Sequence, residues 1–196
     1  LAWRRVARGV SFRLGERERI PCFVTTAHGH YSHHFFSRVM GWGRFVIANS
    51  ERIARHMMDD FGVPPERIRP IPRGVDLSRF PWGDPRLEAP RGEWRVACVG
   101  RITPIKGHRA LLRAFGILSK TFPRARLWIV GEAGPRHPAY LKELHTLVGL
   151  LGLEDKVEFK GYEPDFPRLL RQADLFVLAS TGDEAFGRVL IYSGAM

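Results

Sequence analysis

Two cations follow the end of a strand-like apolar run near the middle of the sequence. The run Val96–Val99 leads into Gly100, and Arg101 comes next. Lys106 follows five residues later, just before an apolar pattern of helical period. Arginine offers a planar fork of N–H donors and lysine a mobile point charge, and both suit phosphate oxygens. Because ligands bind at the carboxyl ends of strands in open α/β sheets, this stretch predicts a phosphate-binding loop. It is not a Walker P-loop, since isoleucine, not glycine, precedes the lysine.

A second motif, Asp183–Arg188, comes about eighty residues later. It follows the apolar run Leu175–Ala179 and opens another helical pattern. Gly187 lets a ligand approach the backbone, where free amides and the positive end of the helix dipole attract anions. Glu184 is then placed to accept hydrogen bonds from sugar hydroxyls. Acidic N-capping of a helix explains the same residues by themselves, but the two motifs together predict a sugar-nucleotide site.

Glycines also end two further strand-like runs. Gly131 is followed by Glu132, and Gly161 is followed by Tyr162. A glycine at such a position admits a flat base, and a tyrosine ring can stack on it. Ordinary turn chemistry is the alternative explanation.

Four histidines gather between His28 and His34. A zinc site is disfavoured, because these imidazoles lack the separated pairs of tetrahedral sites. His28 ends a strand beside Gly29, so we expect it to make a polar contact to phosphate or acceptor. We expect the other three to be solvated.

The composition is that of a globular protein, with 196 residues and a net charge of +11. Residues 101–150 hold nine Arg or Lys against two acids, whereas residues 151–196 hold five against eight. Nucleic acid, an anionic membrane surface and phosphorylated ligands are the partners that such a bias suggests, with solvated helix faces as the simplest explanation.

Cys22 and Cys98 lie in apolar runs and are expected to be buried, reduced thiols. No apolar stretch is long enough to span a bilayer, and no signal peptide is expected. The start at Leu1 and the end at Met196 suggest a piece of a longer chain.

Strand-like and helix-like segments alternate along the chain, which predicts mostly parallel sheets covered on both faces. Strands are expected at 20–27, 45–48, 67–72, 95–100, 126–131, 156–159 and 174–179. Helices are expected at 32–40, 51–61, 107–122, 139–150 and 165–171 and from about 187. Ser50 is the expected N-cap of the second helix. Residues 73–94, rich in glycine and proline without periodicity, read as a linker.

With these motifs in order, the chain resembles the retaining glycosyltransferases of family 4, which have the GT-B architecture of two Rossmann-like domains and a glycosyl transferases group 1 C-terminal domain. The resemblance rests on Thr25–Gly29, Val46–Glu51, Ile68–Asp76, Val99–Arg101 with Lys106–Gly107, Ile129–Gly131, Val157–Tyr162, Ala173–Asp174 and Glu184–Arg188. It implies an acceptor-side domain over 1–80, a linker over 81–94 and an incomplete nucleotide-sugar domain over 95–196. The first domain would lack its N-terminal part and the second its C-terminal part.

The resemblance also implies roles for the site residues. Arg101 and Lys106 would bind the donor diphosphate, together with the backbone of Gly187, Arg188 and Val189. Glu184 matches the first glutamate of the family's E-x7-E motif, which touches the donor sugar, and His28 matches a histidine near the reacting centre. The base and ribose would contact Gly131, Glu132, Tyr162 and Tyr192. No metal is expected, and the nucleoside-diphosphate sugar is the co-substrate.

One position departs from the family pattern. The second glutamate of E-x7-E should stand at 192, where this chain has Tyr192. In the family that carboxylate holds the ribose hydroxyls, and a phenol cannot bridge two hydroxyls as a carboxylate does. Losing a charged contact of this kind costs about 1.5–3 kcal/mol of binding free energy. The tyrosine leaves open an altered donor or a non-catalytic relative.

The predicted function is therefore retaining transfer of a sugar from a nucleoside-diphosphate sugar to a hydroxyl of a glycan or lipid-linked acceptor of the cell envelope, such as lipopolysaccharide. The predicted location is the cytoplasm, with peripheral contact to anionic lipid at the inner face of the plasma membrane as a hypothesis. Because the family's catalysis needs both domains, this piece by itself is expected to show no turnover. A nucleic-acid-binding protein is a remote alternative, since Phe115, Trp128 and Phe176 fall at core-like positions and not on a basic face.

Overall fold

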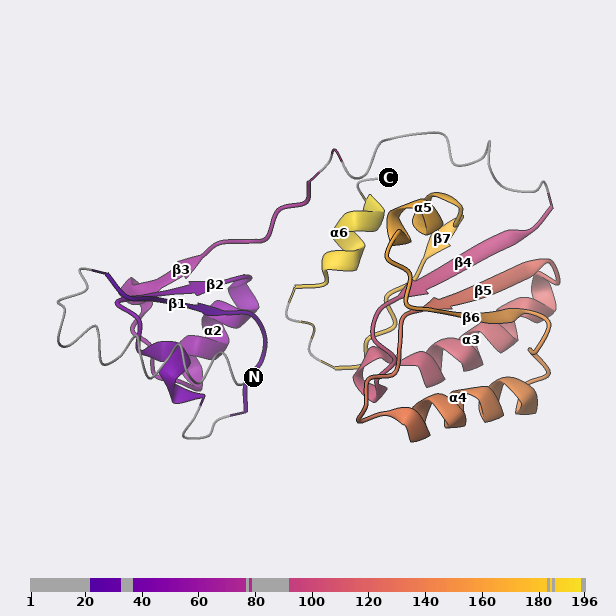
Figure 1. The fold of residues 1–196 in the computed structure, drawn as a ribbon, viewed down its shortest axis with the longest axis horizontal. Coiled ribbons are helices and arrows are strands. Elements are labelled where there is room, and N and C mark those ends of the chain that lie inside the picture. The colour runs from indigo at the N-terminus through magenta and orange to yellow at the C-terminus, as the bar shows by residue number, and fades with distance from the viewer. Residues whose placement is uncertain are drawn as a thin grey trace. The chain divides into compact units, whose positions relative to one another are not determined.

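The computed structural model describes residues 22–32, 37–76, 78, 92–182, 184 and 186–194. The chain forms two compact units (Figure 1). One consists of residues 1–74 with 184–186, and the other of residues 75–183 with 187–196. The predicted linker, 81–94, lies outside the described residues as far as 91.

The first unit is built on a three-stranded parallel sheet in the order β1-β2-β3. Its strands are β1 (Val24–Ala27), β2 (Phe45–Ala48) and β3 (Ile68–Pro70), with 3₁₀ turns at Arg38–Gly41 and Pro65–Arg67. Helix α2 (Glu51–Asp59) begins as predicted at Ser50, whose side-chain oxygen accepts a hydrogen bond from the Ile53 amide. Its apolar face buries Ile53, Ala54 and Met57 against the sheet.

The second unit contains a four-stranded parallel sheet in the order β6-β5-β4-β7. The strands are β4 (Trp94–Val99), β5 (Ala125–Val130), β6 (Val157–Gly161) and β7 (Leu175–Phe176). Helices α3 (His108–Thr121) and α4 (Pro138–Leu150) cover one face, and α5 (Phe166–Arg171) and α6 (Arg188–Gly194) lie on the other (Figure 1). A strand, a helix and the next parallel strand follow one another, as the alternating pattern predicted.

Alternation along β4 and β5 supplies a separate core for each face. Cys98, Leu127 and Ile129 pack with α3 and α4, where Leu112 and Leu144 are fully buried. The intervening side chains Ala97, Trp128 and Val130 point to the other face, where α5 and α6 add Leu169, Leu170 and Tyr192. Fully burying an apolar side chain contributes about 1.5–3 kcal/mol to the free energy of folding. The cores on both faces therefore stabilise the position of the strands in the sheet.

Several predicted elements differ from the structure. Strand β7 has two residues where six were expected, and a 3₁₀ turn at Pro104–Lys106 was not foreseen. Between 32 and 40 the described residues form only the 3₁₀ turn that begins at Arg38. The expectation that both thiols are buried was wrong for Cys22, which is exposed before β1.

Candidate functional site

The turns that follow β4, β5 and β6 are joined to one another by backbone hydrogen bonds. The Gly100 amide donates to the Val130 carbonyl at 2.9 Å, and the Gly131 amide donates to the Gly161 carbonyl at 2.7 Å. Beyond them, the Ile102 amide donates to the carbonyl of Glu132 at 2.9 Å. The carboxyl ends of three strands therefore form one continuous layer of backbone.

This layer requires a glycine at position 131. Gly131 has φ of 136°, and a Cβ atom there would lie 2.0 Å from the Gly100 carbonyl oxygen. Such a backbone conformation and such a close approach are open only to glycine. The structure thus places Arg101, Glu132 and Tyr162 at the same edge of the sheet, each directly after one of these glycines. All three side chains are exposed, Tyr162 to 71%.

The loop that carries Lys106 packs against the segment that follows β7. Gly107, with φ of 70°, connects the 3₁₀ turn to α3, and a Cβ atom there would lie 1.8 Å from the Ala179 carbonyl oxygen. The Thr181 amide donates to the Ile105 carbonyl at 3.0 Å. Lys106, half-buried, is therefore held by backbone contacts on both sides, whereas Arg101 is exposed.

Two neutral groups lie beneath this loop. Burial raises the pKa of the Cys98 thiol to about 11, although a hydrogen bond with the Ala179 backbone and the charge of Lys106 act in the opposite sense. Burial also lowers the pKa of His108, which is fully buried; the nearby Thr103 backbone opposes this shift and Lys106 adds to it. Neither ring nitrogen of His108 has a hydrogen-bond partner of normal geometry. The side chains of Cys98 and His108, which lie beneath this loop, are therefore uncharged at neutral pH.

The second predicted motif lies between β7 and α6. Gly187 is buried with φ of 67°, and its carbonyl accepts a hydrogen bond from the Leu190 amide at 2.9 Å. Helix α6 begins at Arg188, and Val189 is half-buried. Glu184 is half-buried, while Asp183, Ala185 and the side chain of Arg188 lie outside the described part of the chain.

Tyr192 is half-buried in α6 and belongs to an apolar cluster. Its ring lies 5.4 Å from that of Phe166 in α5, and Leu169 and Leu170 belong to the same cluster. Position 192 therefore contributes packing to the second unit.

His28 directly follows β1 in the first unit, and its contacts within the described part of the chain include Tyr31, Asn49 and Arg73. Its amide donates to the Tyr31 hydroxyl at 3.0 Å, and its carbonyl accepts from the Asn49 side chain at 3.1 Å. Its Nδ1 lies 2.7 Å from the Arg73 guanidinium. The sequence signal for Arg73 was weak: it stands within the family motif Ile68–Asp76, but nothing in its spacing indicated a histidine 45 residues away as its partner.

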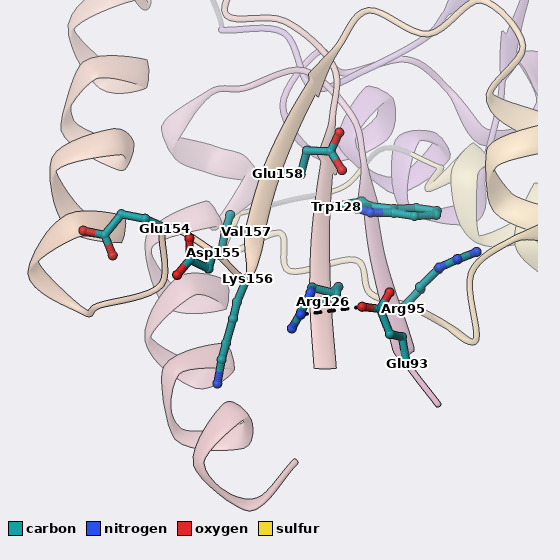
Figure 2. A pocket seen from close by; sticks show the side chains of 9 residues that line it. All are labelled: Glu93, Arg95, Arg126, Trp128, Glu154, Asp155, Lys156, Val157 and Glu158. Carbon is teal, nitrogen blue, oxygen red and sulfur yellow. Dashed lines mark ion pairs between the residues drawn. The ribbon is translucent and has the colours of Figure 1, made fainter. Parts of the chain in front are cut away.

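Sequence reasoning also missed a pocket of about 380 Å³ at the opposite, amino ends of β4, β5 and β6 (Figure 2). Trp128 contributes to it, and an ion pair joins Glu93 to Arg126 at 3.5 Å. The lining holds three cations and four carboxylates: Arg95, Arg126, Lys156, Glu93, Glu154, Asp155 and Glu158. This balance of charge does not favour a phosphate, so the pocket is not the predicted donor site.

Among the described residues, no three His, Cys, Asp or Glu side chains gather so that they could hold a metal ion, and His33 and His34 lie outside them. No helix in the described ranges is both long and apolar enough to cross a membrane.

Comparison with known proteins agrees with this arrangement. The family model described as glycosyl transferases group 1 matches residues 84–195, and the model of glycosyltransferase family 4 matches residues 5–79. The chain belongs to the group 1 glycosyl transferases. The solved structures it resembles show that it has the GT-B fold, and the two parallel sheets are those of that fold.

Mannosylfructose-phosphate synthase of Agrobacterium fabrum is 36% identical over 157 residues, which is 74% of this chain and 34% of that protein. D-inositol 3-phosphate glycosyltransferase of Segniliparus rotundus is 32% identical over 81% of this chain and 38% of that protein. The crystal structure of Anabaena HepE in complex with UDP and glucose is 28% identical, with a TM-score of 0.76 over 88% of this chain and 50% of that one. This group 1 glycosyl transferase chain thus spans about a third of these curated relatives and half of that solved structure.

Proposed function

We propose that this chain forms part of an enzyme that transfers a sugar from a nucleoside-diphosphate sugar to a hydroxyl group of a glycan or lipid-linked acceptor. The observation that carries the proposal is the single backbone layer at the carboxyl edge of the second sheet. Gly100, Gly131 and Gly161 build that layer, and the cations Arg101 and Lys106 follow its first strand. Donor binding at the carboxyl ends of parallel strands is the general behaviour of open α/β sheets.

In this proposal Arg101 and Lys106 bind the diphosphate, and the amides of the α6 start, at Gly187, Arg188 and Val189, add to it. The base lies on the glycine turns, against Glu132 and Tyr162. A nucleoside diphosphate carries two or more negative charges, and charge-assisted hydrogen bonds to such oxygens are about twice as strong as neutral ones. Solved relatives crystallised with UDP and UDP-glucose support this class of donor.

Glu184 and His28 are proposed to contact the reacting sugar, with retention of anomeric configuration and without a resident metal ion. The proposed acceptor belongs to the cell envelope. Peripheral binding to anionic lipid in the cytoplasm is proposed from the nine basic residues between 101 and 150. Co-sedimentation with vesicles tests this last point, and binding that ignores both anionic lipid and salt contradicts it.

The main test is calorimetry with UDP, GDP and ADP and their sugars, preceded by a thermal-shift screen of the same panel. We expect one nucleotide to bind selectively. Arg101→Ala and Lys106→Ala should each weaken that binding about tenfold to a hundredfold, because each removes a contact worth about 1.5–3 kcal/mol. The matched control is Lys120→Ala, which removes an exposed cation at the end of α3. Equal effects of all three substitutions would contradict the assigned site.

A second candidate function is a non-catalytic relative that keeps the fold. The packing of Tyr192 against Phe166, at the position of a family glutamate, favours this candidate. It predicts that none of the nucleotides binds in the same panel. Nucleic-acid binding would show instead as a strongly salt-dependent response to oligonucleotides, and the burial of Phe115 and Trp128 speaks against it.

A further inference from the structure

The contact between Arg73 and His28 restricts where the imidazole carries its proton. The Arg73 Nη2 atom lies 2.7 Å from His28 Nδ1, a normal hydrogen-bond distance. Arginine has only donors and stays charged in proteins, so it must donate and Nδ1 must accept. In a neutral imidazole with an accepting Nδ1, the proton is on Nε2.

The backbone around His28 is fixed independently of Arg73. The Tyr31 hydroxyl accepts from the His28 amide, and the buried Asn49 side chain donates to the His28 carbonyl. The Tyr31 amide in turn donates to His56 Nε2 at 3.0 Å, and His56 Nδ1 lies 2.5 Å from Asp60 Oδ2. The loop that bears His28 is thus tied to α2, so the ring is presented to Arg73 from a fixed backbone.

We propose that Arg73 is a positioning residue that holds His28 in the Nε2–H tautomer. His28 then offers its substrate a hydrogen-bond donor, and it does not act as a general base. This assignment of a substrate rests on the proposed function, but the tautomer itself does not. A base would need an unprotonated nitrogen directed at the substrate hydroxyl, and the unprotonated nitrogen here is occupied by a guanidinium. The group that His28 contacts is therefore an acceptor oxygen.

The test is nitrogen-15 NMR of the histidine side chains of this chain without any nucleotide, with His28→Gln used to assign the signals. In the unsubstituted chain we expect Nδ1 of His28 without a proton, and a through-hydrogen-bond coupling to Arg73 Nη2. In Arg73→Met the coupling should vanish and the Nδ1–H tautomer should rise severalfold, because the ring is released. Arg73→Lys keeps a donor and should restore most of the preference.

Arg55→Met, which removes an exposed arginine of α2, is the matched control and should change nothing at His28. A proton on Nδ1 of the unsubstituted chain overturns the proposal, and this readout does not require Arg73→Met to fold. An unchanged tautomer ratio in a folded Arg73→Met chain overturns it as well. Failure of nucleotide binding with the expected tautomer counts against the proposed function alone.

Discussion

The ring of Tyr192 packs against the ring of Phe166, with centroids 5.4 Å apart and ring planes inclined at 51°. The two residues come from α6 and α5 and join an apolar cluster with Leu169 and Leu170 on one face of the second sheet. Tyr192 therefore serves the packing of this unit, whatever role the resemblance implies for position 192. Any effect of position 192 on nucleotide binding must be separated from its effect on stability.

We expect Tyr192→Glu to bind its nucleotide about tenfold to a hundredfold more tightly, because a carboxylate can bridge the two ribose hydroxyls. The same substitution should lower stability, since the aromatic pair contributes about 0.5–1.5 kcal/mol beyond its buried area. Calorimetry with the selected nucleotide and urea unfolding measure the two effects separately. Unchanged or weaker affinity in the folded variant contradicts the prediction.

Tyr192→Phe is the control for this experiment. It keeps the ring against Phe166 and removes only the hydroxyl. Its free energy of unfolding should stay close to that of the original chain, whereas any nucleotide contact through the hydroxyl is lost.

Gly131→Ala should be strongly destabilising. The new methyl group would meet the Gly100 carbonyl at 2.0 Å, in a backbone conformation with φ of 136° that side chains rarely adopt. We expect a loss of at least about 1–3 kcal/mol in the free energy of unfolding, measured in urea. Gly134→Ala is matched to it in the same loop, where a Cβ atom meets nothing within 4 Å. That substitution should be neutral or stabilising, and similar losses for both would show that the strand ends are not in close contact.

The starts of the second unit's helices, and the ends of α3, α4 and α5, could be predicted to within one residue, and its strands less closely. Helix α3 was expected over 107–122 and spans His108–Thr121, because Leu111, Leu112 and Phe115 recur at the helical period and are buried on one side of the helix. The strand after Asp174 was overestimated for a physical reason. Val177 and Ala179 do pack against the core, but the strand itself includes only Leu175 and Phe176, and its pairing with β4 ends at the hydrogen bond from the Val177 amide to the Ala97 carbonyl. An apolar pattern in the sequence indicates which side chains are buried, but it does not indicate which backbone groups form the hydrogen bonds of a sheet.

From the sequence, only those parts of the site that are formed by residues close together along the chain could be predicted. Glycines that end strands, such as Gly100 and Gly131, are visible in the sequence, and parallel topology brings them to one edge. The contact between Arg73 and His28 joins residues 45 positions apart, so it depends on how β1 and the residues after β3 are placed. The spacing of residues within a single sequence does not reveal a contact between two such distant side chains. The exposure of Cys22 was missed because its apolar neighbours resemble those of a buried strand.

The two thiols should differ sharply in reactivity. The exposed Cys22 should react with an aromatic disulfide reagent at pH 8 in the folded chain, whereas Cys98 should react only after unfolding. The pKa of about 11 for Cys98 also has a consequence for stability. The unfolded chain loses this proton first as the pH rises above about 9, so the free energy of unfolding should fall by about 2 kcal/mol as the pH approaches and passes 11.

Urea unfolding between pH 8 and 11 measures this slope. Cys98→Ala should flatten it, and Cys22→Ala, the matched control, should leave it unchanged. Rapid labelling of both thiols in the folded chain contradicts the prediction.

Burial of His108 predicts the opposite pH dependence on the acid side. Its pKa lies below 6.5 in the folded chain because burial disfavours the charged ring, so the unfolded chain takes up this proton first as the pH falls. The contribution of His108 to stability is therefore intact above about pH 6.5 and declines below it. His108→Leu should remove that decline, and it should not weaken the fold at neutral pH, because it also removes two buried ring nitrogens that have no hydrogen-bond partner of normal geometry. His145→Gln, at an exposed position of α4, is the control and should keep the acid slope. Urea unfolding of the three chains between pH 7.5 and 5 measures how the free energy of unfolding depends on pH. Equal pH dependence for the original chain and His108→Leu would show that the imidazole is charged or solvated in the folded state.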